Sequence, residues 1–353
     1  MKCKTVALRQ SGWLLCGVTL LVLTGCPRSQ ARVVVYCAQD QEFAEGLFGE
    51  FKQQSGLEVA PKYETEAKKS VTHYAEIVSE KARPRCDVFW NNEILGTIRL
   101  QRQGMLEPYD SPAAAPFPKS AKADDHTWCA FGNRARVIVV NTKLVKEEDR
   151  PRSLFDLTQP RWQGKVVMAQ PQYGTTATQA ACLFEILGAD KAKDYYRALK
   201  ANGVQLAPGN KQVAEWVGQG RTPSGNVVAV GVTDTDDAME EVHDNHDVAL
   251  IFPDRDAQAG RMGTLYIPNT VAILKGCPNP EGARKLVDYL LSPEVEAKLA
   301  TGGSHQIPLN PNVKAELPPQ YDKNPRPAQV DFAKAADLWD EVQKFLEAEF
   351  AAP

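Results

Sequence analysis

The alternation of extended and helical patterns is the feature that most constrains how this chain can fold. Three strands and two helices are predicted in alternation: residues 32–36, 39–55, 57–63, 73–82 and 87–90. Phe43, Leu47, Phe48 and Phe51 share one face of the first helix, and Gly56 is placed to end it. This β-α-β-α-β order favours a parallel sheet, so the chain is predicted to be an α/β protein.

The same alternation restarts after Trp128. Further strands are predicted at residues 136–141, 165–169, 248–252 and 265–274, and helices at residues 175–187, 191–201, 281–291 and 330–350. Two extended crossings, near residues 133–139 and 265–271, imply two lobes joined by a hinge, with a cleft between them. We expect lobe 1 to comprise residues 26–132 and 265–310, lobe 2 residues 133–264, and a C-terminal helical segment residues 311–353.

A buried strand that leads into a polar turn and a helix marks the predicted ligand site. The apolar run at residues 227–232 is typical of a parallel strand covered on both faces. Polar residues follow at its carboxyl end, where open α/β sheets bind ligands. Asp237 and Glu240 have the spacing of a capping box, so the next helix is predicted to begin at Asp237. The candidate binding residues of this turn are Thr233, Asp234, Thr235 and Asp236.

The N-terminal residues have the pattern of an export signal. Basic residues at Lys2, Lys4 and Arg9 precede the apolar stretch 13–23, and Leu23-Thr24-Gly25-Cys26 follows. This segment resembles the lipobox of bacterial lipoproteins, which implies a signal peptide at residues 1–25, a lipid on Cys26, and a periplasmic protein anchored to the cell membrane. A retained membrane helix and an uncleaved signal without lipid are the alternatives, although the apolar run is short for a membrane span.

Charge and cysteine content exclude some classes of function. The formal net charge is -3 and the pI is about 6.0, so no basic stripe indicates a nucleic-acid partner. Five cysteines remain after Cys26, without CxxC or Cys/His metal spacing, and we expect buried thiols or at most two disulfides. They are Cys37, Cys86, Cys129, Cys182 and Cys277.

Five segments follow the order and spacing of a known family: VVVYCAQD, CDVFWNNEI, FGNRARVIVVNT, QPRWQGKVVMAQPQYGT and SHQIPLNPNV. Together they resemble the periplasmic ferric-ion-binding proteins of ABC importers. The resemblance covers residues 32–345 and implies a two-lobed type II periplasmic-binding-protein fold with two hinge strands. It also implies a monomeric receptor that closes on a small solute or ferric ion and delivers it to a membrane permease. No cofactor is implied, since iron would be the cargo.

The resemblance assigns residues to the cleft position by position. Tyr36 and Asp40 occupy the turn after the first strand, where a family ligand lies, although Tyr36 also fits a packed strand end. Asn92 and Glu93 occupy the turn that carries the family's cleft carboxylate, and Glu93 is equally placed to cap the helix from Ile94. A third turn, after a mid-chain strand, carries Tyr173, Gly174 and Thr175, and its amides are suited to an anion.

The chain departs from the family at the turn after residue 232. Ferric-binding members place two adjacent tyrosines there, whereas this chain has Thr235 and Asp236. The pair Tyr195-Tyr196 lies inside a predicted helix and is not expected to replace them. An oxygen-rich site for a hard cation remains available from other residues. Its predicted ligands are Asp40, Glu93, Tyr173 and Asp236.

Ferric iron is the ligand that the resemblance favours, and two alternatives stay open. The same cleft suits a phosphonate, a phosphosugar or an amine-bearing solute, with Arg134 or Arg136 holding the oxyanion. Asp234-Thr235-Asp236 also matches the paired aspartates of haloacid-dehalogenase-type phosphatases, but the residues that follow depart from that motif. We therefore expect a receptor and not an enzyme.

Overall fold

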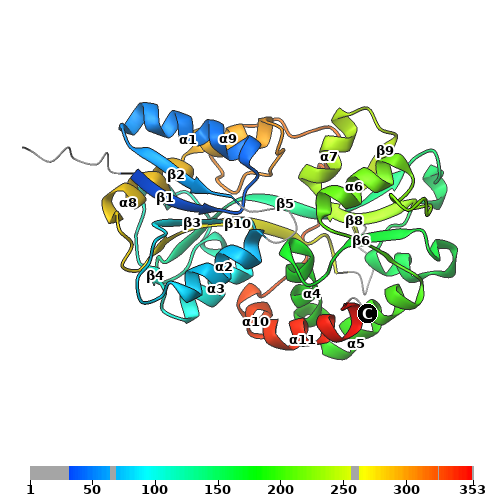
Figure 1. Cartoon of the computed structure of the whole chain (residues 1–353). Helices are drawn as coiled ribbons and strands as arrows, with labels where there is room; N and C mark the ends of the chain where they lie inside the picture. Colours follow the sequence, from blue (N-terminus) through cyan, green and yellow to red (C-terminus); the bar gives the residue numbers. More distant parts are fainter. Residues whose placement is uncertain (1–31, 64–68, 256–261, 325, 352–353) are drawn as a thin grey trace, which may run out of the picture.

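The computed structural model describes residues 32–63, 69–255, 262–324 and 326–351. Two α/β lobes lie side by side and share one continuous path of hydrogen-bonded strands (Figure 1). The predicted signal peptide and Cys26 lie outside the described residues. Within those residues, none of the helices has the length and apolar character needed to cross a membrane.

The first lobe is built on a mixed sheet with the strand order β2-β1-β3-β10-β5. β1 pairs in parallel with β2 and β3, whereas β10 is antiparallel to β3, β4 and β5. The strands are β1 (Arg32–Cys37), β2 (Glu58–Lys62), β3 (Val88–Asn91), β4 (Leu106–Glu107), β5 (Trp128–Asn141) and β10 (Tyr266–Leu274). The helices are α1 (Gln41–Ser55), α2 (Lys69–Ser79), α3 (Ile94–Arg102), α8 (Pro280–Leu290) and α9 (Pro293–Thr301), and short 3-10 turns lie at η1 (Pro112–Ala114) and η2 (Lys119–Ala121).

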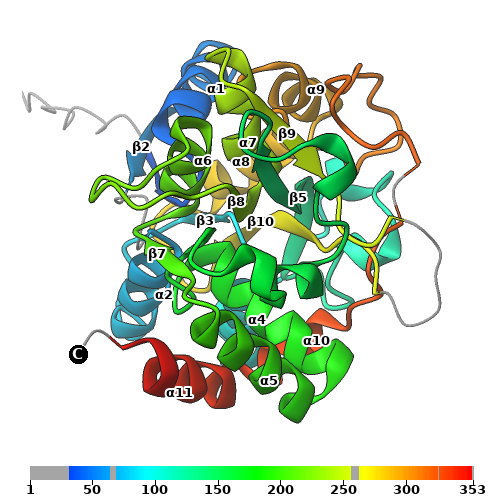
Figure 2. The same ribbon diagram turned by 90° about the vertical axis from the view of Figure 1, so that its right-hand side faces the viewer.

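The second lobe continues the path with β5, β8, β6 and β7, and β9 pairs with β5. Its strands are β6 (Val166–Ala169), β7 (Gln205–Ala207), β8 (Val230–Asp234) and β9 (Val248–Ile251). Its helices are α4 (Gly174–Leu187), α5 (Ala189–Ala201), α6 (Asn210–Gln219) and α7 (Thr235–His243), with 3-10 turns η3 (Glu147–Asp149), η4 (Leu154–Thr158) and η5 (Pro160–Trp162). Figure 2 views this lobe along the axis that joins the two.

β5 is the strand that joins the lobes. Residues 128–135 pair with β10, and residues 136–140 pair with β8. Gly132 lies within β5 at φ 55°, and the register between β5 and β10 shifts between Pro268 and Asn269. An L side chain is strained at that φ, so glycine is required where the strand changes direction. The predicted crossing at residues 133–139 therefore lies within an observed shared strand.

The C-terminal helices α10 (Phe332–Asp337) and α11 (Trp339–Phe350) pack against both lobes (Figure 1). α10 contacts α3 of the first lobe and α4 of the second, and α11 contacts α4. Arg102 of α3 donates to the carbonyl oxygen of Ala333 at 2.9 Å. The hydrophobic cluster beneath them combines Ile98 of α3 with Phe184 of α4 and Leu346 of α11.

Two predictions about the stretch around residue 230 are wrong. The strand begins at Val230 and not at Val227, which is 53% exposed. This strand, β8, pairs in parallel with β6, but it is antiparallel to β5, which enters from the other lobe. The helix begins at Thr235 with Asp234 as N-cap, so Asp237 lies in its first turn and makes no capping box.

The sequence also missed α6 and α9, which are short helices of the two lobes. None of the five predicted thiols is in a disulfide within the described part of the chain. Four of them are buried, and Cys277 is partly exposed.

Candidate functional site

Four helices begin at one cavity between the lobes. The cavity has a volume of about 30 Å³, and the N-cap residues of α1, α4, α6 and α7 all line it. None of these four residues makes a side-chain capping hydrogen bond. The first-turn amides of a helix carry partial positive charge, so four helix dipoles favour negative charge here. The N-cap residues are Asp40, Tyr173, Gly209 and Asp234.

Asp234 organises the floor of the cavity. Its Oδ1 accepts from Nη1 of Arg136 at 2.9 Å, and its Oδ2 accepts from Thr175 Oγ1 at 2.6 Å and Asn210 Nδ2 at 3.2 Å. Burial acts to raise the pKa of Asp234, but the guanidiniums of Arg136 and Arg134 outweigh it and hold the pKa below its ordinary value. This carboxylate therefore stays ionised and ties β5, α4 and α6 to the end of β8.

Asp236 and Arg134 form a second buried pair at the same cavity. Arg134 Nη1 lies 3.4 Å from Asp236 Oδ2, and its Nη2 donates to the carbonyl oxygen of Asn92 in the first lobe. Asp236 Oδ1 and Arg134 Nε are buried and have no hydrogen-bond partner among the described residues. Burial raises the pKa of Asp236 to about 7, with Arg134 opposing the shift and Asp234 and Asp40 adding to it. A buried, unsatisfied carboxyl oxygen is suited to accept from a ligand.

Carboxylates and the guanidinium together give the cavity both signs of charge. Asp40 and Asp237 line it beside Asp236, while Arg134 is the only basic side chain among the residues that line it. The carboxyl oxygens of Asp234, Asp236 and Asp237 lie within 4.8 Å of one another. The acidic side can accept from amino or hydroxyl groups or bind a hard cation, and the helix N-termini can hold an anion.

Comparison with known proteins identifies the family. Residues 97–336 match the family model described as bacterial extracellular solute-binding protein. The chain belongs to this family of solute-binding proteins.

Relatives of this solute-binding protein differ in what their names say they bind. The major ferric iron-binding protein of Neisseria meningitidis is 26% identical over 298 residues, which cover 82% of this chain and 85% of the relative. The periplasmic binding protein AfuA of Actinobacillus pleuropneumoniae, solved with fructose 6-phosphate, is 25% identical with a TM-score of 0.78 and covers 92% of this chain and 100% of AfuA. Iron-bound HitA of Pseudomonas aeruginosa is 21% identical with a TM-score of 0.77 and covers 90% of this chain and 99% of HitA.

The family and the fold agree with the resemblance seen in the sequence. The two-lobed periplasmic-binding-protein fold is confirmed, and the chain acts as the solute-binding component of an ABC importer. The family consists of solute-binding proteins, which gives no support to the phosphatase reading of Asp234-Thr235-Asp236.

The solute-binding protein brings most of the candidate residues to one place. Asp40, Asn92, Tyr173, Gly174, Thr175, Asp234 and Asp236 all line the small cavity. Glu93 does not: its carboxylate caps α3, accepting from Leu95 N at 2.7 Å and Gly96 N at 2.9 Å. It also accepts from Thr178 of the second lobe at 3.0 Å, so it serves the interface between lobes. Glu93 therefore takes the helix-cap role that the sequence offered as its alternative.

Three further candidates lie away from the cavity. The Tyr36 hydroxyl donates to Glu80 at 2.9 Å, and the ring packs against His73, which matches the packed-strand-end alternative. Thr233 donates to the carbonyl oxygen of Asn210, and Thr235 accepts from Ala135 N at 3.2 Å. Each of the three side chains is committed to holding elements together, so none of them is placed to touch a ligand in the cavity.

Tyr195 and Tyr196 lie in the core of the second lobe, as the sequence indicates. Tyr195 packs on Phe155 and Tyr196 on Phe345 and Phe350. Both are almost completely buried, and burial raises the pKa of each phenol far above its ordinary value. Neither can serve as a tyrosinate ligand in the cleft.

The sequence missed several residues that line the cavity. Pro208, Gly209 and Asn210 lie at the start of α6, a helix that was not predicted. The turn Pro208-Gly209-Asn210 after an apolar pair was the available signal. Gln170 and Asp237 also line the cavity, and the position of Asp237 in the first turn of α7 brings it there.

Proposed function

We propose that this solute-binding protein captures an organic phosphate or phosphonate that also carries amino or hydroxyl groups. The convergence of four helix N-termini on one cavity carries the proposal, because first-turn amides are donors suited to phosphoryl oxygens. Tyr173 and Gly174 at α4 and Gly209 at α6 are the amide-bearing side of the cavity. The fructose 6-phosphate bound to AfuA is a solute of this class.

The opposite side of the cavity would receive the donors of the same solute. The buried Oδ1 of Asp236 lacks a partner, and Asp40 and Asp237 line the wall beside it. Because the pKa of Asp236 is raised, an additional positive charge or hydroxyl donor there relieves an unfavourable concentration of negative charge. Arg134 stays protonated, because burial lowers its pKa but the neighbouring aspartates raise it by more. Its Nε has no hydrogen-bond partner among the described residues and can donate to a phosphoryl oxygen.

Ferric iron is the second candidate, favoured by the cluster of Asp234, Asp236 and Asp237 and by the ferric-binding relatives. Three features weigh against it. Asp234 is already committed to Arg136, and the Arg134 guanidinium lies in the same cavity, where it would repel a trivalent cation. Tyr173 is the one tyrosine among the described residues that line the cavity. The proposed ligand set for iron would be Asp40, Tyr173 and Asp236, without Glu93.

Titration calorimetry on the ligand-free mature protein tests the choice. The probes are inorganic phosphate, 2-aminoethylphosphonate, fructose 6-phosphate and ferric citrate. We expect at least one organic probe to bind more tightly than inorganic phosphate, and Asp236→Asn to weaken it by about tenfold or more. Ferric binding with a visible charge-transfer band and no binding of either organic probe would contradict the proposal and favour iron.

We also propose that the protein is lipidated on Cys26 after removal of residues 1–25, held at the membrane from the periplasmic side, and active as a monomer with its permease. The lipobox-like Leu23-Thr24-Gly25-Cys26 supports the anchor. Cys26→Ser should move the protein from the membrane fraction to the soluble fraction, and its retention in the membrane would refute the anchor.

The proposed lobes are residues 26–132 with 265–310, and residues 133–264, followed by a C-terminal helical segment at 311–353.

A further inference from the structure

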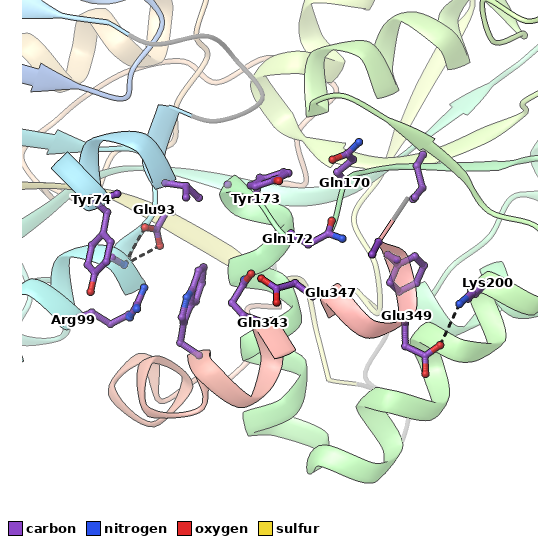
Figure 3. Close-up of a pocket in the computed structure, with 18 of the residues that line it drawn as sticks. Tyr74, Glu93, Arg99, Gln170, Gln172, Tyr173, Lys200, Gln343, Glu347 and Glu349 are labelled. Carbon is purple, nitrogen blue, oxygen red and sulfur yellow. Dashed lines mark hydrogen bonds and ion pairs between the residues drawn. The ribbon is translucent and has the colours of Figure 1, made fainter. Parts of the chain in front are cut away.

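A larger compartment adjoins the small cavity. It has a volume of about 860 Å³ and lies between α2 and α3 of the first lobe, the start of α4, and α11 (Figure 3). Gln170, Tyr173 and Gly174 line both spaces, so the two meet at the start of α4. Sites for small organic ligands commonly have volumes of about 300–1,000 Å³. A bare metal ion would leave most of a space of this size unfilled.

One face of α11 forms a wall of the compartment. Trp339, Gln343 and Glu347 are spaced four residues apart and therefore lie on the same side of the helix. Leu346 anchors α11 in the core, and Glu349, which also lines the compartment, pairs with Arg197 of α5 at 3.0 Å. The wall is therefore held on a packed helix.

Two aromatic rings that line the compartment, one on α2 and one on α11, are braced by one guanidinium. The Arg99 guanidinium lies 4.4 Å from the ring centre of Tyr74 and 5.0 Å from that of Trp339. Tyr74, Arg99 and Trp339 all line the compartment. Aromatic faces fixed in this way offer a flat apolar surface against which the C–H face of a sugar ring can pack.

Two amide groups that line the compartment carry buried atoms without partners. Gln172 Oε1 and Gln343 Nε2 have no hydrogen-bond partner among the described residues. Both side chains lie around the same space in Figure 3, one on the β6–α4 turn and the other on α11. One is an acceptor and the other a donor, and a hydroxyl group can satisfy either. Buried polar atoms without partners are costly, so a ligand rich in hydroxyl groups would remove the cost of both.

We propose that this compartment binds the hydroxylated body of a phosphosugar whose phosphoryl group is held at the starts of α4 and α6. The C-terminal helix α11 thereby selects the solute, through Trp339 and Gln343. This inference rests on the proposed function and narrows its solute class to phosphorylated sugars.

Calorimetry with two probes separates the compartment from the phosphoryl site. Fructose 6-phosphate has the hydroxylated body that the proposal places in the compartment, whereas 2-aminoethylphosphonate carries only the two charged ends. We expect Gln343→Ala and Trp339→Leu each to weaken fructose 6-phosphate about tenfold and to change 2-aminoethylphosphonate by less than about twofold. Lys344→Ala, on the exposed side of α11, is the matched control and should alter neither. Circular dichroism melts confirm that each variant is folded, and Gln343→Ala keeps the test valid if Trp339→Leu unfolds.

The outcomes divide cleanly. Equal weakening of both probes, or no weakening of fructose 6-phosphate, would overturn the role of α11. Wild-type protein that binds 2-aminoethylphosphonate but not fructose 6-phosphate would also overturn it, while leaving the proposed function standing. Wild-type protein that binds neither organic probe would refute the proposed function itself.

Discussion

Arg134 Nη1 and Asp236 Oδ2 lie 3.4 Å apart in a setting that satisfies neither side chain completely. Arg134 comes from the strand that joins the lobes, and Asp236 from the first turn of α7. Because Asp234 and Asp40 are also near, burial and negative neighbours prevail over the guanidinium and raise the pKa of Asp236. The pair therefore stores unfavourable electrostatic energy at the position where a ligand would relieve it.

The first prediction concerns the pH dependence of stability without ligand. The pKa of Asp236 rises from 3.8 to about 7 on folding, so the folded state binds more protons than the unfolded state between these values. Asp236 consequently lowers the free energy of unfolding as pH rises from 4 to 7. Asp236→Asn removes this loss, and we expect the variant to be more stable than wild type by about 1–4 kcal/mol at pH 8.

Urea unfolding of both proteins at several pH values measures this difference. The stability gap should be small near pH 4, widen up to pH 7 and stay constant above it. Asp194→Asn, at an exposed position of α5, is the control and should show no such trend. A gap that does not vary with pH, or a wild type more stable than the variant at pH 8, would contradict the raised pKa.

The second prediction concerns the tyrosines. Tyr195 and Tyr196 lie in the core of the second lobe, so Tyr195→Phe and Tyr196→Phe should leave the affinity for any cleft ligand unchanged. The buried Tyr195 hydroxyl has no hydrogen-bond partner among the described residues, and its removal should change stability by no more than about 1 kcal/mol. Tyr173→Phe is the informative comparison, since Tyr173 lines the cavity. Loss of binding in Tyr195→Phe or Tyr196→Phe, with the fold intact, would reopen the tyrosinate-iron reading.

The sequence was sufficient to predict most of the fold. Strands such as residues 32–36 and helices such as residues 39–55 have strong apolar periodicity, and Gly56 ends the first helix at φ 70° as predicted. The stretch at residues 227–232 failed because an apolar run does not reveal where pairing starts. Val227 is apolar but exposed and makes only an isolated bridge with Arg221, whereas pairing with β5 and β6 begins at Val230.

The site was predicted in outline, and the errors have one physical origin. Turns at the ends of strands bring the predicted residues Asp40, Tyr173 and Asp236 to the cavity. Sequence periodicity cannot show in which direction a side chain points within such a turn. Glu93 turns back to cap its own helix and lines the larger compartment instead of the small cavity, and Tyr36 turns toward Glu80. The compartment beside α11 depends on contacts between residues far apart in the chain, which no local pattern contains.

The third prediction concerns the strand that joins the lobes. Gly132 has φ 55°, and a Cβ added there would lie 2.3 Å from Gln306 Oε1. Its amide also donates to Glu296 at 2.7 Å, so the backbone cannot easily shift. We expect Gly132→Ala to lower the free energy of unfolding by about 1–3 kcal/mol.

Gly49→Ala is the matched control for Gly132→Ala. Gly49 lies inside α1, and nothing is within 4 Å of the position that a Cβ would take. Alanine is the better helix former, so this variant should gain about 0.4–1 kcal/mol. Thermal and urea unfolding measure both variants. Gly132→Ala that is as stable as wild type would show that β5 does not need its left-handed residue.

Native mass spectrometry of the mature protein purified from its own cells identifies the solute that the protein carries. We expect a bound organic solute that contains phosphorus, released on denaturation, identifiable by its mass, and absent when Asp236→Asn is purified in the same way. A protein that carries iron, or a solute without phosphorus, or a phosphorus-containing solute retained fully by Asp236→Asn, would contradict this expectation.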